Sequence, residues 1–247
     1  MMASSLTWLT SVLPSSFKYK LAGLRPLYTR ILGFGQPLAT VHSAAGSFRW
    51  TIDELTSQAY LRAAHEPAMQ QLFLRHLRPG SVVWDVGAHA GFHSLFAALL
   101  VRPTGRVFAF EPSPRTRDSL EFRVRANPEL DVVVMPYALG DCCSVLGMET
   151  SRGSQSHISE SARWTVEGRT IDSLVDEGCC PPPDLIKIDV EGYEEPVLRG
   201  ALETLRKFSP ILLCDYNDSN TFELVARNLT PLDYDVRPGP PVCAVRC

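Results

Sequence analysis

The segment VWDVGAHAG, residues 83–91, constrains the fold more than any other part of this 247-residue chain. Residues 82–84 have the composition of a short buried strand, and residues 92–101 form an apolar run of helical length. Gly87 and Gly91 bracket the turn between them, where larger side chains would obstruct a ligand. A strand, a glycine turn and a helix in this order predict the first half of a nucleotide-binding βαβ unit.

An acidic residue at the end of the next predicted strand supports this interpretation. Residues 106–110 are predicted to form that strand, and Glu111 follows it, 26 positions after Asp85. In nucleotide-binding units, a carboxylate at this position accepts hydrogen bonds from the ribose hydroxyls. We therefore expect an adenosine derivative to bind, with its ribose against Glu111 and the adjacent Pro112.

The residues of the turn indicate which adenosine derivative this is. A dinucleotide fingerprint has glycines spaced G-x-G-x-x-G, so that backbone amides approach a pyrophosphate. Here the spacing is D-x-G-x-x-x-G, and Asp85 takes the position of the first glycine. A carboxylate there would repel a pyrophosphate but would suit the amino group and sulfonium of S-adenosyl-L-methionine. We expect this cofactor to contact Asp85, the turn glycines Gly87 and Gly91, and Ala88 and His89. An NAD-dependent oxidoreductase, the alternative, would need the missing glycine.

The rest of the chain continues the alternation of strands and helices. After the fourth strand the pattern predicts one continuous helix, because its apolar residues between 197 and 205 share a face. Residues 138–141 are predicted to form a turn. The other predicted elements are a helix over 113–126, strands over 132–136, 185–188 and 211–214, helices over 171–177 and 221–228, and strands over 233–237 and 242–246.

Six stretches, in this order and spacing, resemble the FkbM family of S-adenosylmethionine-dependent methyltransferases: VVWDVGAHAGFHSLFA, GRVFAFEPSPRTRDSL, MPYALGD, RTIDSL, DLIKIDVEGYEEPVLRGA and PILLCDY. They span about residues 80–216, and DLIKIDVEG is the most distinctive. The resemblance implies an α/β, Rossmann-like seven-stranded methyltransferase sheet, mostly parallel, with helices on both faces. It also implies methyl transfer to a hydroxyl of a sugar, glycolipid or polyketide-like acceptor. A non-catalytic relative that binds cofactor or a partner remains an alternative.

Four predicted strands end on acids: Asp85, Glu111, Asp189 and Asp215. Because the carboxyl ends of parallel strands meet at one edge of the sheet, we expect these carboxylates to lie close together. A hydroxyl acceptor must lie about 3 Å from the methyl carbon and must lose its proton. We predict that Glu191, just beyond the fourth strand, removes this proton, with Asp189 as the second catalytic candidate and a further cofactor contact.

Three further residues are predicted to contact the cofactor or the acceptor. Ala138, after the third strand, is expected to contact the cofactor. His157 and Asp215 are expected to contact the acceptor, although many family members have Glu where Asp215 stands, and the shorter side chain reaches less far. Acids near the fourth and fifth strands, with Asn217 and Asp218 close by, also resemble Mg²⁺ ligands. Their spacing is not diagnostic, and we expect no metal.

The charge distribution divides the chain at about residue 52. Residues 1–52 carry five basic residues and no acid, whereas the remainder has a formal charge of −8. We predict that residues 1–52 form a basic, apolar extension that packs on the domain, and that residues 53–247 form a single methyltransferase domain with a β-hairpin-like insert at about 142–170. Alternatively, residues 1–35 contact a membrane surface or a partner enzyme.

Composition also narrows the class of partner. A net charge of −3 and a pI near 6.1 argue against a nucleic-acid-binding protein, which needs a basic surface. Seven cysteines without a C-x-x-C pair predict free thiols in a reducing cytosol. The apolar runs are shorter than the ~20 residues of a membrane span. We therefore expect a cytoplasmic protein with a small-molecule or glycan or lipid acceptor; the sequence leaves the oligomeric state open.

Overall fold

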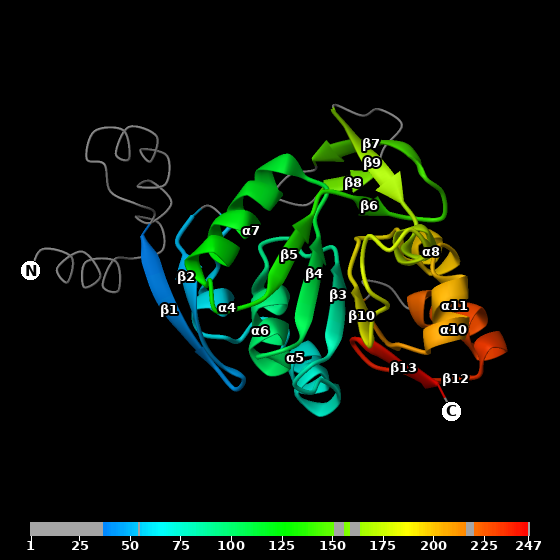
Figure 1. Cartoon of the computed structure of the whole chain (residues 1–247), viewed down its shortest axis with the longest axis horizontal. Helices are drawn as coiled ribbons and strands as arrows, with labels where there is room; N and C mark the ends of the chain where they lie inside the picture. The colour runs from blue at the N-terminus through cyan, green and yellow to red at the C-terminus, as the bar shows by residue number, and fades with distance from the viewer. Residues whose placement is uncertain (1–36, 54, 151–155, 159–163, 216–219, 247) are drawn as a thin grey trace, which may run out of the picture.

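The computed structural model describes residues 37–53, 55–150, 156–158, 164–215 and 220–246. Its centre is a seven-stranded sheet, in which all strands are parallel except β13, which runs antiparallel to both of its neighbours (Figure 1). This confirms the predicted α/β, Rossmann-like, mostly parallel fold. In spatial order the strands are β12 (Tyr234–Arg237), β13 (Val242–Arg246), β11 (Ile211–Cys214), β10 (Leu185–Ile188), β3 (Val82–Val86), β4 (Arg106–Phe110) and β5 (Val132–Met135).

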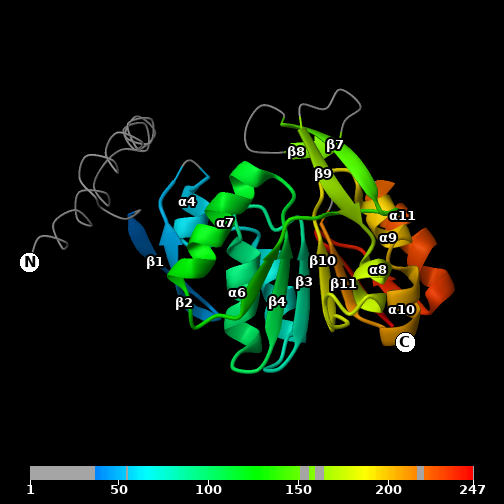
Figure 2. The ribbon, with the colours of Figure 1, turned by 45° about the horizontal axis from the view of Figure 1, so that its top comes forward.

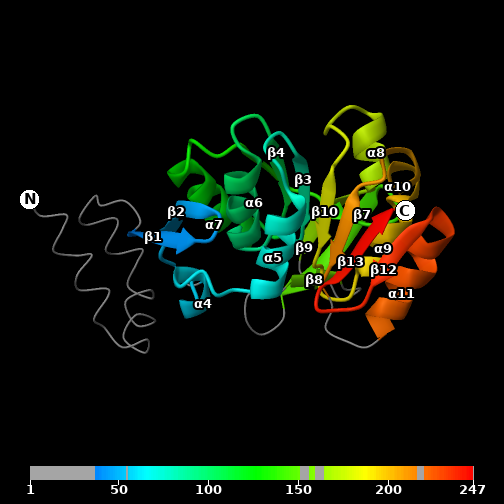
Figure 3. The ribbon, with the colours of Figure 1, turned by 90° about the horizontal axis from the view of Figure 1, so that it is seen from below.

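Helices cover both faces of this sheet (Figure 3). One face packs against α5 (Pro67–His76), α6 (Phe92–Val101) and α7 (Pro114–Ala126); the other packs against α8 (Ile171–Asp176), α9 (Glu194–Arg199), α10 (Leu202–Phe208) and α11 (Asn220–Leu229), which leads into the short 3-10 helix η1 (Thr230–Leu232). The alternation of side chains along a strand explains the division, because Val83 belongs to the first core and Trp84 to the second.

The strand order places a reversal point between β3 and β10. The chain leaves β3 toward β4 and β5 on one side, and later returns to form β10 and β11 on the other. In open α/β sheets, ligands bind outside the carboxyl ends of the strands at such a point. The glycine turn that follows β3 lies at this position.

The predicted single helix over the 197–205 region is wrong, because it is broken into α9 and α10 at Gly200 and Ala201. A Cβ at Gly200 would lie 1.9 Å from the carbonyl oxygen of Gly140, so two backbone segments meet closely there. The Gly200 carbonyl also accepts a hydrogen bond from the Asp172 amide of α8 at 2.9 Å. The close contact with these two segments therefore interrupts the helix at Gly200.

A second, four-stranded sheet stands beyond the carboxyl ends of β4 and β10 (Figure 2). It consists of β6 (Ala138–Leu139), β9 (Trp164–Arg169), β7 (Ser144–Thr150) and β8 (Ser156–Ile158). The segment predicted as an insert, 142–170, contains the last three of these strands. The turn predicted at 138–141 is partly wrong, since Ala138 and Leu139 pair with β9.

The described part of residues 1–52 forms an antiparallel hairpin of β1 (Leu38–Ser43) and β2 (Gly46–Thr51), followed by α4 (Gln58–Leu61). Phe48 of β2 packs on Phe92 of α6 with ring centroids 5.7 Å apart. The guanidinium of Arg123 stacks on Trp50 at 4.0 Å and pairs with Asp53 at 2.6 Å. The contacts predicted for residues 1–35 lie outside the described residues. Among the described helices, none is long and apolar enough to cross a membrane.

Candidate active site

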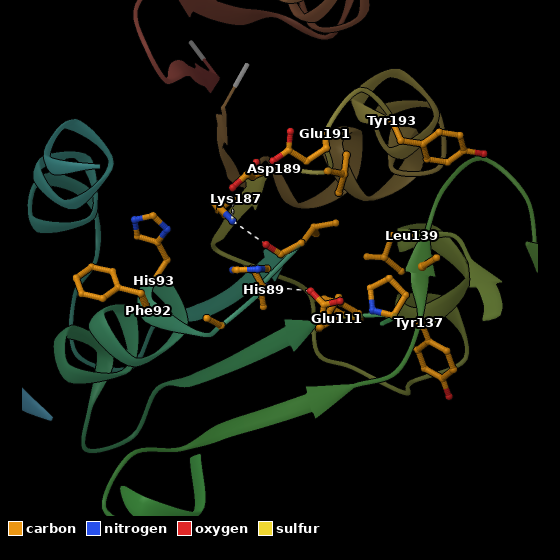
Figure 4. A pocket seen from close by; sticks show the side chains of 18 of the residues that line it. His89, Phe92, His93, Glu111, Tyr137, Leu139, Lys187, Asp189, Glu191 and Tyr193 are labelled. Carbon is orange, nitrogen blue, oxygen red and sulfur yellow. Dashed lines mark hydrogen bonds and ion pairs between the residues drawn. The ribbon is translucent and has the colours of Figure 1, made fainter. Parts of the chain in front are cut away.

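A cavity of about 460 Å³ lies at the carboxyl ends of β3, β4 and β10 (Figure 4). The α4–α5 segment lines one side of it, and the four-stranded sheet lines the other. The structure brings eight residues with predicted site roles to this cavity: Gly87, Ala88, His89, Glu111, Pro112, Ala138, Asp189 and Glu191. Their convergence makes this cavity the candidate active site.

The glycine turn packs between the carboxyl ends of β4 and β10. Gly87 has a φ of +78°, and a Cβ there would lie 1.9 Å from the backbone oxygen of Asp189. The amides of Gly87 and Ala88 donate to the Phe110 carbonyl at 3.1 and 3.0 Å, which ties the turn to β4. Gly91, with a φ of +85°, packs against Leu120 and does not line the cavity. A side chain at Gly87 would therefore force the two strand ends apart.

We predict that Gly87→Ala weakens the binding of S-adenosylhomocysteine on the order of tenfold or more and lowers the free energy of unfolding by about 1–3 kcal/mol, the usual cost of overpacking. Calorimetry and thermal melting measure the two effects. Gly178→Ala is the matched control, because Gly178 has a similar φ of +70° but nothing within 4 Å of its Cβ position. Equal effects of the two substitutions would mean that backbone conformation, not the contact with Asp189, decides the result.

Glu111 presents a buried carboxylate to the cavity. Its Oε2 accepts a hydrogen bond from the His89 amide at 2.9 Å, and its Oε1 accepts one from the Ser113 amide at 2.9 Å. Burial raises the pKa of Glu111 to about 7, although these two backbone donors oppose the shift. Each carboxylate oxygen has a second lone pair, so Glu111 retains the capacity to accept hydrogen bonds from two ligand hydroxyls.

The raised pKa of Glu111 predicts that cofactor affinity depends on pH. Ribose hydroxyls donate to the ionised carboxylate, so binding releases the proton that the free protein holds below about pH 7. We expect the affinity for S-adenosylhomocysteine to rise by up to about tenfold per pH unit as the pH approaches 7, and to level off above it. Isothermal titration calorimetry across this range measures the effect.

The Glu111→Gln variant is the control for this pH dependence. This variant should bind S-adenosylhomocysteine weakly, and its affinity should not rise with pH. An unchanged rise in affinity for Glu111→Gln would assign the proton to another group.

The same pKa shift affects the stability of the ligand-free protein in the opposite direction. Because the pKa of Glu111 is about 7 in the folded state against 4.5 ordinarily, the free energy of unfolding should fall as the pH rises through this interval.

Asp85 does not lie where we expected. Its carboxylate is buried beneath the cavity, accepts a hydrogen bond from the Ser94 hydroxyl at 2.5 Å and pairs with Lys187 Nζ at 3.1 Å. The register explains this arrangement, since Lys187 is directly beside Asp85 on the neighbouring strand. Asp85 therefore compensates a buried lysine, and it is not among the residues that line the cavity.

Lys187 joins the turn to the end of β10. Its ammonium group donates to the Gly87 carbonyl at 3.0 Å and lies 3.3 Å from Asp189 Oδ2. Burial alone would lower the pKa of Lys187, but the carboxylates of Asp85 and Asp189 outweigh it and raise the pKa. Lys187 is therefore a buried cation that is hydrogen-bonded to the Gly87 turn.

The two predicted catalytic acids both line the cavity, in different surroundings. Asp189 is half-buried and paired with Lys187, as Figure 4 shows. Glu191 is exposed and has a φ of +54°. Residues other than glycine rarely adopt this left-handed backbone conformation, which is enriched at functional sites. Glu191 lies two positions after Asp189 and lines the same cavity.

Of the two predicted acceptor contacts, the structure describes the side chain of Asp215 but not that of His157. Asp215 follows β11, and its carboxylate lies within 4.8 Å of the carboxylates of Glu66 and Asp189. The backbone of His157 belongs to β8, opposite Glu149 of β7, and its side chain is outside the described structure. Asp215 is thus near the site, although it does not line the cavity.

The sequence did not indicate the residues that the α4–α5 segment and α6 bring to the cavity, notably Tyr60, His65, Glu66 and His93. The Tyr60 hydroxyl lies 3.5 Å from His89 Nδ1. Burial raises the pKa of Tyr60 to about 12 and lowers the pKa of His89 to about 4, so both are neutral at pH 7. The only sequence signal for this group is His65-Glu66 directly before Pro67, at the start of a helix.

A glycine turn, a carboxylate at the next strand end and a cavity at the reversal point define an α/β protein with a nucleotide-type binding site. The sequence profile of the methyltransferase FkbM domain matches residues 85–236, and the chain belongs to this family. It is 31% identical over 146 residues to the hexuronic acid methyltransferase AglP of Haloferax volcanii, a match that covers 58% of this chain and 59% of AglP. The chain thus matches less than two thirds of that relative.

Other relatives agree with this family and fold. The 2-O-methyltransferase NoeI of Sinorhizobium fredii is 27% identical over 168 residues, with 59% of this chain and 67% of NoeI covered. Two solved structures share the fold: precorrin-6y C5,15-methyltransferase of Geobacter metallireducens (TM-score 0.52, 17% identical, 81% and 94% of the chains) and methyltransferase FkbM of Methylobacillus flagellatus (TM-score 0.51, 16% identical, 78% and 56%).

Proposed function

We propose that the protein is an S-adenosylmethionine-dependent O-methyltransferase that acts on a hydroxyl of a sugar-containing acceptor. The observation that carries the proposal is the cavity at the reversal point, where the turn at Gly87, the carboxylate of Glu111 and the acids Asp189 and Glu191 meet within an FkbM domain. The relatives AglP and NoeI are named as methyltransferases, one for hexuronic acid and one as a 2-O-methyltransferase. These names support an oxygen acceptor on a sugar.

The lining residues suit the cofactor. A volume of about 460 Å³ lies within the usual range of small-molecule sites, roughly 300–1,000 Å³. Glu111 would accept the ribose hydroxyls, and Pro112 and Ala138 would offer apolar contacts. Gly87 and Ala88 would let the ligand approach the backbone, and Asp189 would offer the carboxylate for the amino group. When bound, S-adenosyl-L-methionine supplies a methyl group on a positively charged sulfur.

Glu191 would act as the general base for the acceptor. Glu191 is exposed and lines the cavity, two positions beyond Asp189 at the end of β10, so an acceptor hydroxyl could approach it. Glu191 would take the hydroxyl proton while the acceptor oxygen forms its bond to the methyl carbon and the electrons of the carbon–sulfur bond stay on sulfur. Most of the acceleration would come from holding the oxygen in line with that bond.

The test is transfer of a labelled methyl group from S-adenosyl-L-methionine to glycans, with and without hexuronic acid, while calorimetry measures the binding of S-adenosylhomocysteine. Labelled sugar and bound S-adenosylhomocysteine are the expected results. Binding without transfer to any glycan would favour a non-catalytic relative. Binding of NAD without S-adenosylhomocysteine would overturn the proposal in favour of an oxidoreductase, which the family match already disfavours.

We also propose that the protein works in the cytoplasm. The six cysteines that the structure describes are free thiols, as expected in a reducing compartment. The proposed contact of residues 1–35 with a membrane surface or a partner enzyme would bring the site to a lipid-linked or enzyme-bound glycan. Cell fractionation of the full chain and of a chain that lacks residues 1–35 distinguishes these locations.

A further inference from the structure

Three potential metal ligands converge on the cavity from the α4–α5 segment and α6. His65 Nε2 lies 3.0 Å from Glu66 Oε1, and His93 Nε2 lies 3.7 Å from Glu66 Oε2. The two imidazole rings stack with centroids 5.1 Å apart. All three residues line the cavity, and their ligand atoms lie within 4.8 Å of one another.

Two of these atoms are buried without a hydrogen-bond partner. His93 is only 4% exposed, and within the described structure neither its Nε2 nor Glu66 Oε2 makes a hydrogen bond. The 3.7 Å between them is too long for one. Buried polar atoms are nearly always satisfied, and each exception requires an explanation such as a missing ion. A cation between the two atoms would satisfy both.

An ion pair between His93 and Glu66 is the competing explanation. A charge-assisted hydrogen bond between an imidazolium nitrogen and a carboxylate oxygen is about 2.7–2.9 Å long. The facing atoms of His93 and Glu66 are 3.7 Å apart and do not make such a bond. A metal ion between them would use the lone pairs of both atoms.

The backbone also directs Glu66 into the cavity. Glu66 precedes Pro67 at the N-cap of α5, with a left-handed φ of +43°, but its side chain makes no capping hydrogen bond. Because Glu66 does not cap α5, its strained backbone conformation must be maintained by contacts with the surrounding structure. Its carboxylate instead lies between His65 and His93.

We propose that His65, Glu66 and His93 bind a divalent transition-metal ion of the Zn²⁺ type. Two imidazoles and one carboxylate form a His₂Glu set, which leaves a coordination position open for a ligand. Bonds of about 2.0–2.1 Å to a tetrahedral ion place the donors about 3.3 Å apart, so the present group would close slightly around the ion.

A second group shares Glu66 and is the alternative site. The carboxylates of Glu66, Asp189 and Asp215 also lie within 4.8 Å of one another, and an all-oxygen set suits Mg²⁺. However, Asp189 already pairs with the ammonium group of Lys187 at 3.3 Å, and that charge opposes a cation nearby. The histidine set, with its unsatisfied buried nitrogen, is therefore favoured.

The position of the site gives the ion a role that rests on the proposed function. The three proposed ligands line the same cavity as Asp189 and Glu191, so an acceptor bound there could reach the ion. An acceptor hydroxyl bound there would lose its proton more easily, because the ion stabilises the negative oxygen. The proton would pass to Glu191, the oxygen would form the bond to the methyl carbon, and the electron pair of the broken carbon–sulfur bond would remain on sulfur.

The test is calorimetric titration of the full chain with ZnCl₂ after dialysis against a chelator. One equivalent of Zn²⁺ should bind, and the affinity should fall by at least about 10–100-fold in His65→Ala and Glu66→Gln, since even an outer-shell partner contributes that much. Both side chains are partly exposed, at 27% and 32%, so these variants should fold. His42→Ala, at an exposed position of the β1–β2 hairpin, is the matched histidine control and should bind Zn²⁺ normally.

The binding of S-adenosylhomocysteine, measured on the same samples, separates this proposal from the proposed function. Zn²⁺ binding without S-adenosylhomocysteine binding would support the metal site while the methyltransferase proposal fails. Unchanged Zn²⁺ affinity in both variants would overturn the metal site and assign the ion to the thiols. Preference for Mg²⁺, lost in Asp215→Asn, would overturn it in favour of the acidic group. No Zn²⁺ binding would also overturn it.

Discussion

Lys187→Met should lower the free energy of unfolding by about 3–5 kcal/mol, the usual cost of breaking a buried ion pair by removing one partner. Asp85 is 1% exposed, and without Lys187 its charge would have no compensating cation at 3.1 Å. For a chain of this size, each kcal/mol lowers the melting temperature by roughly 2–4 °C. Thermal melting and chemical denaturation measure the loss.

Two further variants test the cause of this loss. Asp85→Asn in the Lys187→Met background removes the uncompensated charge and should restore part of the stability. Lys207→Met is the surface control: Lys207 is exposed on α10, so its replacement should change the free energy of unfolding by less than about 0.5 kcal/mol. A Lys187→Met protein as stable as the wild type would mean that Asp85 is not held as a buried carboxylate.

The sequence predicted the strands of the sheet and the glycine turn, because both depend on local patterns. The apolar run at residues 92–101 is α6 to the residue, and the strand predicted at 106–110 is β4. The sequence points to Gly87 because a tight turn requires its backbone conformation, and to Glu111 because it directly follows a strand; both line the cavity. The strand order then brings them together at the cavity.

The position of Asp85 was mistaken for a reason that strand geometry supplies. Side chains alternate along β3, so Asp85 shares the face of Val83, which packs under α6. Lys187 occupies the neighbouring position on β10, which register reveals only after the strands are paired. A cofactor-facing carboxylate would need the opposite orientation or a place beyond the strand, as Asp189 has.

The hairpin and the histidine cluster depend on contacts between distant segments. Trp50 of β2 is held by Arg123 of α7, 73 positions later, and nothing local in its strand indicates that partner. Likewise His65 and Glu66 approach His93 only because the α4–α5 segment folds over the start of α6. Periodicity identifies elements, but it does not place loops above a sheet.

Glu191→Gln should lower turnover by ~10²–10⁴-fold, the range for loss of a general base, while the affinity for S-adenosylhomocysteine changes little. Glutamine keeps the size of the side chain but takes no proton at neutral pH. Glu191 has a left-handed backbone, lines the cavity and is exposed, so an acceptor hydroxyl could approach its carboxylate. Single-turnover rates of methyl transfer, with saturating cofactor, measure the chemical step directly.

Glu195→Gln is the matched control for this substitution. Glu195 lies in the first turn of α9, four positions after Glu191. It does not line the cavity, and it pairs with Arg199 and Arg227 at 3.5 and 3.1 Å. Ion pairs between exposed side chains contribute little to stability, so the variant should fold and its turnover should stay near that of the wild type. Near-normal turnover in Glu191→Gln would contradict its role as base and transfer that role to Asp189. In that case Asp189→Asn should show the larger loss, together with weaker cofactor binding, because Asp189 also contacts the Gly87 turn through Lys187.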